Sequence, residues 1–285
     1  MSRAMRAYYY AVLGAMGGLI GWQASNLMGL SLLGSLWLSE VVVGGVIGMC
    51  VGLLLGTSEA LLTRQARRVA RSAALGGALG FGAGAVGLPL GEGLFLAVGA
   101  GSLARAIGWG VFGLLVGVGE GLVGGSQWWK GALGGALGGA LGGALLEAAR
   151  ARLADPLLGK GLGLVLLGAS VGAGIALIVV LLTRAWLQVV SGKLKGSEFI
   201  LDKFLKPQGP TAILGSDALK ADIVVPDPDV APQHALLRGA GTHFELKDLS
   251  TQGTFVDGRR IERARLSDRQ RIRVGNTELV YHERR

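Results

Sequence analysis

The pattern of hydrophobic and polar positions changes sharply near residue 190. Before that point the chain consists of long apolar stretches rich in glycine, alanine and leucine, and after it come short segments in which apolar and polar residues alternate. A helix needs about 20 apolar residues to cross a bilayer. Six stretches approach this length, at residues 8–24, 41–62, 73–91, 107–125, 131–147 and 162–187. We therefore predict an all-α membrane bundle of about six spans in residues 1–190, followed by an all-β domain.

Aromatic and basic residues predict how the bundle is oriented. All six tryptophans lie in this part of the chain, mostly at predicted helix ends, as is typical of residues at the headgroup level. Residues 25–40 carry no lysine or arginine, whereas Arg3 and Arg6 precede the first span. Within them, Asn26–Glu40 is an apolar stretch that we interpret as an interfacial segment. Cytoplasmic loops are enriched in Lys and Arg, so both termini are predicted to be cytoplasmic. Arg105 and the cations of residues 150–160 run against this rule.

An internal repeat predicts that the bundle is made of helix pairs. The block Gly52–Glu59 recurs as Gly113–Glu120, and a weaker third copy begins at Gly174. Each copy follows a segment with glycine or alanine at about every fourth position, a spacing that lets helix backbones approach closely. We predict three helix pairs, each with one such glycine-zipper helix, held together by close packing. A pore lined by small residues and homo-oligomers joined through the same faces are the alternatives.

Acidic residues are rare in the predicted bundle. Five glutamates are the only carboxylates before Asp155. Glu59 and Glu120 occupy matching places in two repeats, and an ionisable group inside a membrane segment is costly and often functional. They are our intramembrane acidic candidates. The alternative is that both lie near the cytoplasmic interface, paired with arginines such as Arg64 or Arg67.

Composition narrows the class of protein. The mean hydropathy of +0.51 is too high for an ordinary soluble protein. The formal net charge of +9 lies largely at the ends of apolar segments and no aromatic-basic groove accompanies it, so nucleic-acid binding is not expected. The single cysteine, Cys50, excludes an internal disulfide. The sequence has no phosphate-binding Walker loop, metal-ligand cluster or nucleophile constellation, so we expect no catalytic residue, metal or cofactor, and no enzyme.

The segment after residue 190 has the pattern of a β-sandwich. Residues 191–196 are polar and basic and are predicted to be a linker. Strands are predicted at residues 197–203, 221–225, 234–238, 243–249, 253–256, 271–274 and 277–281. Asp257-Gly258 and Gly275-Asn276 are turn signals between strands. Regular turns in an all-β stretch indicate a sandwich over residues 197–285.

Five motifs in this segment carry a resemblance to a known family. They are ILGS at 213–216, ADIVVP at 221–226, VAPQHA at 230–235, LKDLSTQGTFVDG at 246–258 and RIRVG at 271–275. In order and spacing they resemble the forkhead-associated (FHA) family. The resemblance implies a β-sandwich whose loops at one end bind phosphothreonine peptides. The positions that are structural in the family are kept, namely Gly215, His234, Gly253 and Thr254.

The positions that hold phosphate in the family are replaced. Ser216 stands in place of an arginine that contacts phosphate, and Ala231 in place of a phosphate-binding serine. Pro232 replaces another common arginine, and Gln252 an asparagine that holds the peptide backbone. Charge-assisted hydrogen bonds contribute roughly 1.5–3 kcal/mol each, so these losses favour a protein contact that does not depend on phosphate. Lys220 offers a cation, but a flexible ammonium does not replace a planar guanidinium.

These observations predict a membrane protein that binds another protein. The candidate partner-binding residues lie in the predicted loops, at Ser216, Lys220, Ala231, Gln233, Ser250, Thr251 and Gln252. The leading hypothesis is an adaptor in a bacterial inner or cell membrane that recruits a cytoplasmic protein, phosphorylated or not. The alternative is a channel or transporter gated by the FHA-like domain, because one span would be enough for anchoring.

Overall fold

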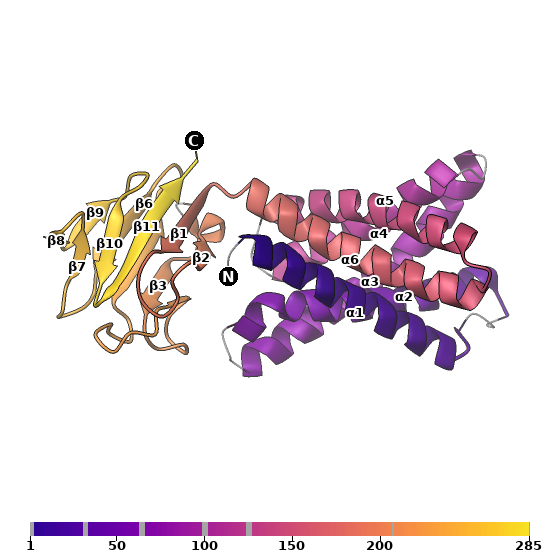
Figure 1. Cartoon of the computed structure of the whole chain (residues 1–285), viewed down its shortest axis with the longest axis horizontal. Helices are drawn as coiled ribbons and strands as arrows, with labels where there is room; N and C mark the ends of the chain where they lie inside the picture. Colours follow the sequence, from indigo (N-terminus) through magenta and orange to yellow (C-terminus); the bar gives the residue numbers. More distant parts are fainter. Residues whose placement is uncertain are drawn as a thin grey trace. The chain divides into compact units, whose positions relative to one another are not determined.

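The chain folds into two compact units. The computed structural model describes residues 3–30, 34–62, 66–98, 102–123, 127–206 and 208–284. Ala4–Leu62 and Ala66–Leu182 form a helical unit, and Thr183–Arg285 belong to a β-rich unit. Figure 1 shows the helices in indigo to salmon and the strands in orange to yellow.

Six helices make up the helical unit. They are α1 (Arg3–Leu27), α2 (Leu36–Leu62), α3 (Ala66–Val98), α4 (Ser102–Val123), α5 (Trp128–Arg152) and α6 (Pro156–Leu181). The start of α6 follows from local chemistry, because the Asp155 carboxylate accepts hydrogen bonds from the Leu157 and Leu158 amides and Pro156 takes the first helical position. The stretch that we expected to be interfacial is shared between the ends of α1 and α2 and the intervening loop.

Five of the six helices, α2 to α6, are long and apolar enough to cross a membrane. The first predicted span, residues 8–24, lies within α1, which does not reach the same hydropathy. Three consecutive tyrosines, Tyr8 to Tyr10, together with Trp22 and Gln23, lower its apolar character. The predicted all-α bundle is confirmed. By these criteria of length and hydropathy, α1 is not confirmed as a membrane span.

The helices approach one another through glycine. A Cβ added at Gly48 on α2 would collide with the carbonyl oxygen of Gly80 on α3, and one added at Gly113 on α4 would collide with that of Gly135 on α5. Similar glycine contacts join α5 to α6, α6 to α1, α1 to α2 and α3 to α4. Each helix therefore packs against the next and α6 returns to α1, which closes a ring of six helices.

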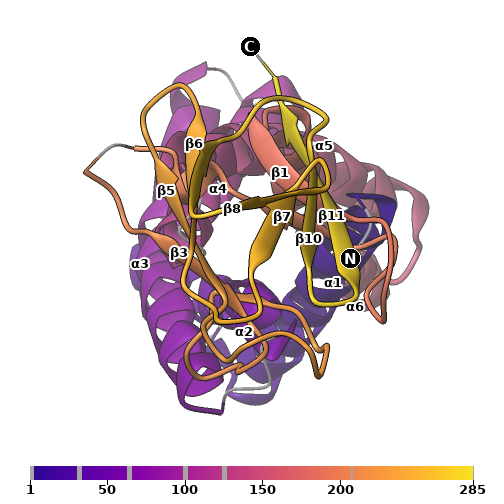
Figure 2. The same ribbon diagram turned by 90° about the vertical axis from the view of Figure 1, so that its left-hand side faces the viewer.

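The β-rich unit is a sandwich of two sheets (Figure 2). One sheet has the order β2-β1-β11-β10-β7-β8 and the other the order β4-β3-β5-β6-β9. The strands of the first sheet are β1 (Ala185–Val189), β2 (Glu198–Ile200), β7 (Thr254–Val256), β8 (Arg259–Ile261), β10 (Arg271–Val274) and β11 (Thr277–Glu283). Those of the second are β3 (Ala212–Gly215), β4 (Ile223–Val224), β5 (Ala235–Gly239), β6 (Phe244–Asp248) and β9 (Arg263–Arg265).

Alternating side chains from both sheets fill the core of the sandwich. Leu187 on β1, Leu237 on β5 and Ile272 on β10 are fully buried. The rings of Phe244 and Tyr281 meet edge to face, with centroids 6.1 Å apart. The hairpin turn between β7 and β8 contains two residues with positive φ, Asp257 and Gly258, at the predicted turn signal. The predicted β-sandwich is confirmed.

The boundary between the units differs from the one that the sequence suggested. The sixth predicted span extended to residue 187, the membrane domain to 190 and the linker over 191–196. In the structure α6 ends at Leu181 and β1 begins at Ala185. This strand pairs with both β11 and β2, so it lies inside a sheet. Its composition misled the prediction, because a strand buried on one face reads as apolar when it directly follows an apolar helix.

Candidate functional site

Three loops meet at one end of the sandwich and form the candidate partner-binding site. They connect β3 to β4, β4 to β5, and β6 to β7. The Ser216 amide in the first loop donates to the Ala231 carbonyl oxygen in the second, at 3.0 Å. The fold thus brings together motifs that lie far apart in the sequence. We refer to these three loops as the loop end.

His234 joins the second loop to the third. Its imidazole is completely buried. Nδ1 accepts a hydrogen bond from the Ala231 amide at 3.1 Å, while Nε2 lies 3.3 Å from both the Gly253 carbonyl oxygen and the Ser250 Oγ. Because Nδ1 acts as an acceptor, the ring proton belongs on Nε2, which then donates to the third loop. This histidine fixes the spacing of the loops.

Asp248 holds the third loop in shape. Its Oδ1 accepts hydrogen bonds from the Ser250 amide at 3.1 Å, the Ser250 hydroxyl at 2.9 Å and the Thr254 hydroxyl at 2.8 Å. Burial by itself would raise the pKa of Asp248, but these hydrogen bonds outweigh burial and hold the pKa below its usual value. The Ser250 hydroxyl in turn accepts from the Gly253 amide at 2.9 Å.

The predicted site residues separate into two groups. Ser216, Ala231 and Ser250 are half-buried, and the hydroxyl of Ser250 is used within its own loop. The exposed candidates are Lys220, Gln233, Thr251 and Gln252. The Lys220 amide donates to the Asp217 carbonyl oxygen in a turn. Its ammonium forms no ion pair with any residue that the structure describes.

Two features of the loop end were missed by the sequence analysis. Arg260 on β8 is exposed, and its Nη2 donates to the Thr251 carbonyl oxygen at 3.2 Å. Leu219 is 78% exposed, the largest value among the exposed large hydrophobic residues. Arg260 follows the turn signal at residues 257–258, so only the pairing of β7 with β8 returns it to the third loop. Leu219 is next to Lys220 in the loop between β3 and β4, and a search for alternating strand patterns does not single out a loop residue.

The acidic candidates in the helical unit are only partly described. Glu120 on α4 is buried, and its Oε1 accepts a hydrogen bond from the Tyr10 hydroxyl on α1 at 3.0 Å. The side chain of Glu59 lies outside the described residues, as do those of Arg64 and Arg67. The proposed pairing between these groups stays a prediction. Nothing in the described residues forms a group of three or more potential metal ligands.

Comparisons with known proteins concern the β-rich unit. Residues 212–275 match the family model described as FHA domain. The solved FHA domain of the CT664 protein from Chlamydia trachomatis is 34% identical with a TM-score of 0.32, over 36% of this chain and 99% of that chain. An FHA domain from an analysis of phosphothreonine-dependent FHA domain interactions is 28% identical, with a TM-score of 0.32 over the same shares. Rv1747 FHA-1 from Mycobacterium tuberculosis is 26% identical, with a TM-score of 0.29 over 36% and 99%. No curated protein matches the chain.

Proposed function

With an FHA domain, a protein-interaction module, in its C-terminal part, we propose that this chain is a membrane-anchored adaptor. The apolar helices hold the chain in the membrane, and the loop end recruits a cytoplasmic partner protein without requiring phosphothreonine. The observation that carries this proposal is a loop scaffold that is kept while the phosphate-holding groups are missing.

The scaffold side of this observation rests on partly buried hydrogen bonds around the fully buried His234. His234 and Asp248 connect the loops through the contacts described above, and the Gly253 amide completes the network. A buried polar network of this kind is costly to leave half-satisfied, so it fixes one arrangement of the loops. The loops are therefore shaped in advance for a partner.

The phosphate side of this observation rests on three of the four replaced positions. A phosphothreonine carries close to two negative charges and is best held by a bidentate arginine. Ser216 has no cationic group, Ala231 has no hydroxyl, and Gln252 is longer than the asparagine it replaces by one methylene. Lys220 and Arg260 supply positive charge at the loop end, but Arg260 is already bonded to the Thr251 carbonyl oxygen.

The chemistry of the exposed surface fits an unmodified protein partner. Leu219 offers apolar area, Gln233, Gln252 and Thr251 offer neutral hydrogen-bonding groups, and Arg260 offers a planar cation. Interfaces combine apolar anchors with satisfied polar contacts, and arginine is enriched among the residues that dominate binding. This mixture suits a folded or extended protein segment that carries a few acidic groups.

The test is a capture experiment with the full-length chain in lipid nanodiscs. Cell lysate is divided, and one half is treated with phosphatase before capture. Specific partners are expected in both halves, and they should be lost with the double variant Leu219→Asp and Gln252→Ala. Gln208→Ala is the matched control, because Gln208 is exposed but does not belong to the loop end. It precedes strand β3, whereas the first loop of the loop end follows that strand. Partners that vanish after phosphatase treatment would contradict the proposal.

A further inference from the structure

A cavity of about 290 Å³ lies within one end of the helical unit. It is lined by the first turns of α2, α4 and α6 and the last turns of α3 and α5. This is the opposite end of the helices from the one at which α6 ends. The volume is near the lower limit of the roughly 300–1,000 Å³ that is typical of ligand pockets. It suits a small metabolite or a lipid headgroup.

The deeper wall of the cavity is apolar. Val43 and Ile47 from α2 and Leu164 from α6 are buried there, and Trp109 from α4 adds an aromatic ring. A ligand that fills this part gains from burying an apolar group. The outer part of the cavity is charged.

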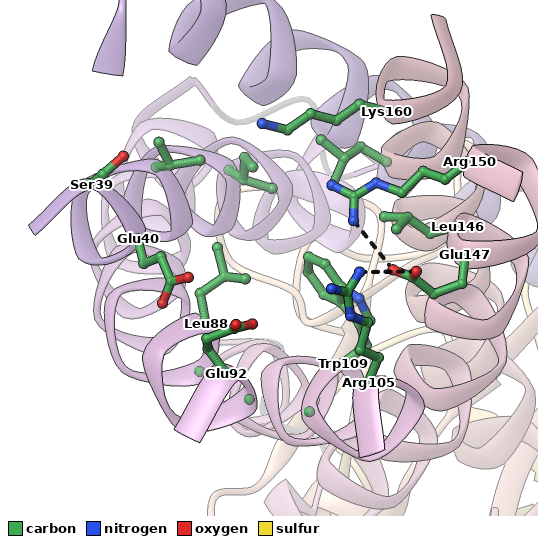
Figure 3. A pocket seen from close by; sticks show the side chains of 16 residues that line it. Ser39, Glu40, Leu88, Glu92, Arg105, Trp109, Leu146, Glu147, Arg150 and Lys160 are labelled. Atoms are coloured by element: carbon green, nitrogen blue, oxygen red, sulfur yellow. Dashed lines mark hydrogen bonds and ion pairs between the residues drawn. The ribbon is translucent and has the colours of Figure 1, made fainter. Parts of the chain in front are cut away.

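Opposite charges face each other across this outer part. Figure 3 shows Glu40 and Glu92 on one side of the cavity and Arg105, Glu147 and Arg150 on the other, with Lys160 extending between them. We call Glu40 and Glu92 the acidic side. The basic side consists of Arg105, Arg150, Lys160 and the intervening Glu147.

Some of these charges neutralise each other and some do not. Glu147 accepts from Arg105 at 3.1 Å and from Arg150 at 3.3 Å. Within the described part of the chain, no hydrogen bond or ion pair reaches the carboxylates of Glu40 and Glu92 or the ammonium of Lys160. The Oε2 atom of Glu40 is buried without a hydrogen-bond partner. A polar group that is buried without a partner costs free energy that a ligand can recover.

We propose that this cavity binds a small zwitterion with an apolar body. Its ammonium lies against Glu40 and Glu92, its anionic group lies against Lys160 and the arginines, and its apolar part contacts Trp109. The six charged side chains of the cavity sum to zero, so a neutral ligand with separated charges fits them. A lone anion would face the acidic side, and a lone cation would face the basic side. The chemistry is that of a free amino acid or of an ethanolamine phospholipid headgroup.

The test measures binding to the purified full-length chain by isothermal titration in detergent. The first probe is L-leucine, with 4-methylpentanoate and isopentylamine as matched compounds that lack the amino and the carboxylate group respectively. L-leucine is expected to bind at least about tenfold more tightly than either compound, because each lacks one charged contact. Glycerophosphoethanolamine is the second probe, because its phosphodiester and ammonium leave it without net charge, and it distinguishes a headgroup from a free amino acid.

Variants connect the binding to the named residues. Lys160→Gln, Glu92→Gln and Glu40→Gln should each weaken binding of the zwitterion by about tenfold or more. Arg152→Gln is the control, because Arg152 is exposed at the same end of the helices and does not line the cavity. Thermal unfolding of each variant shows that it is folded. Binding of glycerophosphoethanolamine without binding of L-leucine would support the site with a lipid as its ligand. Equal binding of the singly charged compounds, unchanged affinity in all three variants, or no binding of either zwitterion would overturn the proposal.

Discussion

Ser216, Ala231 and Gln252 are three of the four positions at which the sequence predicts that phosphate-holding groups of the FHA pattern are replaced. We predict that Ser216→Arg, Ala231→Ser and Gln252→Asn together create binding of a phosphothreonine peptide. The backbone there is already held by the Ser216–Ala231 hydrogen bond and by His234, so the new groups meet a preformed scaffold. Fluorescence anisotropy with a labelled peptide should show a gain in affinity of at least about tenfold over the original chain.

The control for this gain of binding is the same peptide without phosphate. The variant should discriminate between the two peptides, whereas the original chain should bind both weakly and alike. Lysine at position 216 should recover less affinity than arginine, because it cannot form the bidentate contact. An original chain that already prefers the phosphorylated peptide would show that our interpretation of the loop end is incorrect.

Two aspartates, the buried Asp227 and the half-buried Asp248, make the stability of the sandwich dependent on pH. Asp227 accepts from the Asp229 and Asn276 amides, both at 3.0 Å, and from the Thr277 hydroxyl at 2.8 Å. Burial alone would raise the pKa of Asp227, but these hydrogen bonds hold it below its usual value, as they do for Asp248. A lowered folded-state pKa adds stability above the unfolded-state pKa, and this contribution is lost as the pH falls toward the folded-state pKa.

We therefore predict that the sandwich loses stability below about pH 4, the usual range of aspartate. Urea unfolding of residues 183–285, followed by tryptophan fluorescence from pH 7 to 3, measures this change. Asp227→Asn should be less stable at neutral pH, and its stability should vary less with pH in the acid range. A variant with the same acid dependence as the original domain would exclude Asp227 as a source of the effect.

At the scale of elements, strand β1 decides where the sandwich begins. It lies between β2 and β11 in the sheet, and the Asp202 Oδ1 accepts hydrogen bonds from the Arg184 and Ala185 amides at 2.9 and 3.0 Å. Removing it would take the fully buried side chain of Leu187 out of the core, leave β2 without its only partner strand and leave β11 paired on one side alone. We predict that residues 183–285 fold as a soluble domain and that residues 197–285 do not.

Circular dichroism and the dispersion of amide signals in NMR spectra measure this difference between the two fragments. The loss of a central strand removes several buried apolar side chains, each worth roughly 1.5–3 kcal/mol, which is comparable to the total stability of a small domain. A folded fragment 197–285 would show that β1 is dispensable.

The contact between α2 and α3 depends on the absence of side chains. A Cβ at Gly48 would collide with the Gly80 carbonyl oxygen, whereas a Cβ at Gly82, also on α3, would meet nothing within 4 Å. We predict that Gly48→Ala lowers the stability of the helical unit by roughly 1–3 kcal/mol, the usual cost of overpacking. Gly82→Ala should be neutral or slightly stabilising, since alanine is the better helix former.

Thermal unfolding of both variants in one detergent, followed by circular dichroism, compares the two substitutions directly. The pair is matched because each replaces one helical glycine with alanine. Equal melting temperatures for the two variants would show that the helices move apart at little cost.

For the whole molecule, the side of the membrane on which each chain terminus lies is the property that most limits function. Our proposal places the FHA domain in the cytoplasm. If α1 crosses the membrane together with the five more apolar helices, the N-terminus lies on the same side of the membrane as the FHA domain. If α1 does not cross, the N-terminus lies on the opposite side. The cations before the first span favour the cytoplasmic side for both the N-terminus and the FHA domain.

We predict that a fluorescent protein, which matures only in the cytoplasm of bacteria, is bright when fused to either end. Alkaline phosphatase, which is active only outside the cytoplasm, should be inactive at both ends and active when inserted after Met28. A bright C-terminal fusion with a dark N-terminal fusion would mean that α1 lies along the membrane or within the bundle. Bright fluorescence from neither end would reverse the proposed orientation.

How much of this molecule the sequence predicted depends on the range of each interaction. The change in hydropathy near residue 190, the turn at residues 257–258 and the FHA motifs are local patterns, so the two classes of domain and most strands were predicted correctly. The start of the sandwich was misplaced, because only two polar residues, Thr183 and Arg184, interrupt the apolar run from α6 into β1. Only pairing with β11, almost a hundred residues later, identifies β1 as a strand.

The candidate sites divide in the same way. The sequence by itself determined which residue occupies each motif position, and from this it predicts that phosphate-holding residues are missing. The tertiary structure decided that Arg260 reaches the third loop, that the Ser250 hydroxyl is used internally, and that charges from five helices surround one cavity. The physical reason is that side-chain identity is written along the chain, whereas a binding site is a set of distances between segments, and packing alone sets those distances.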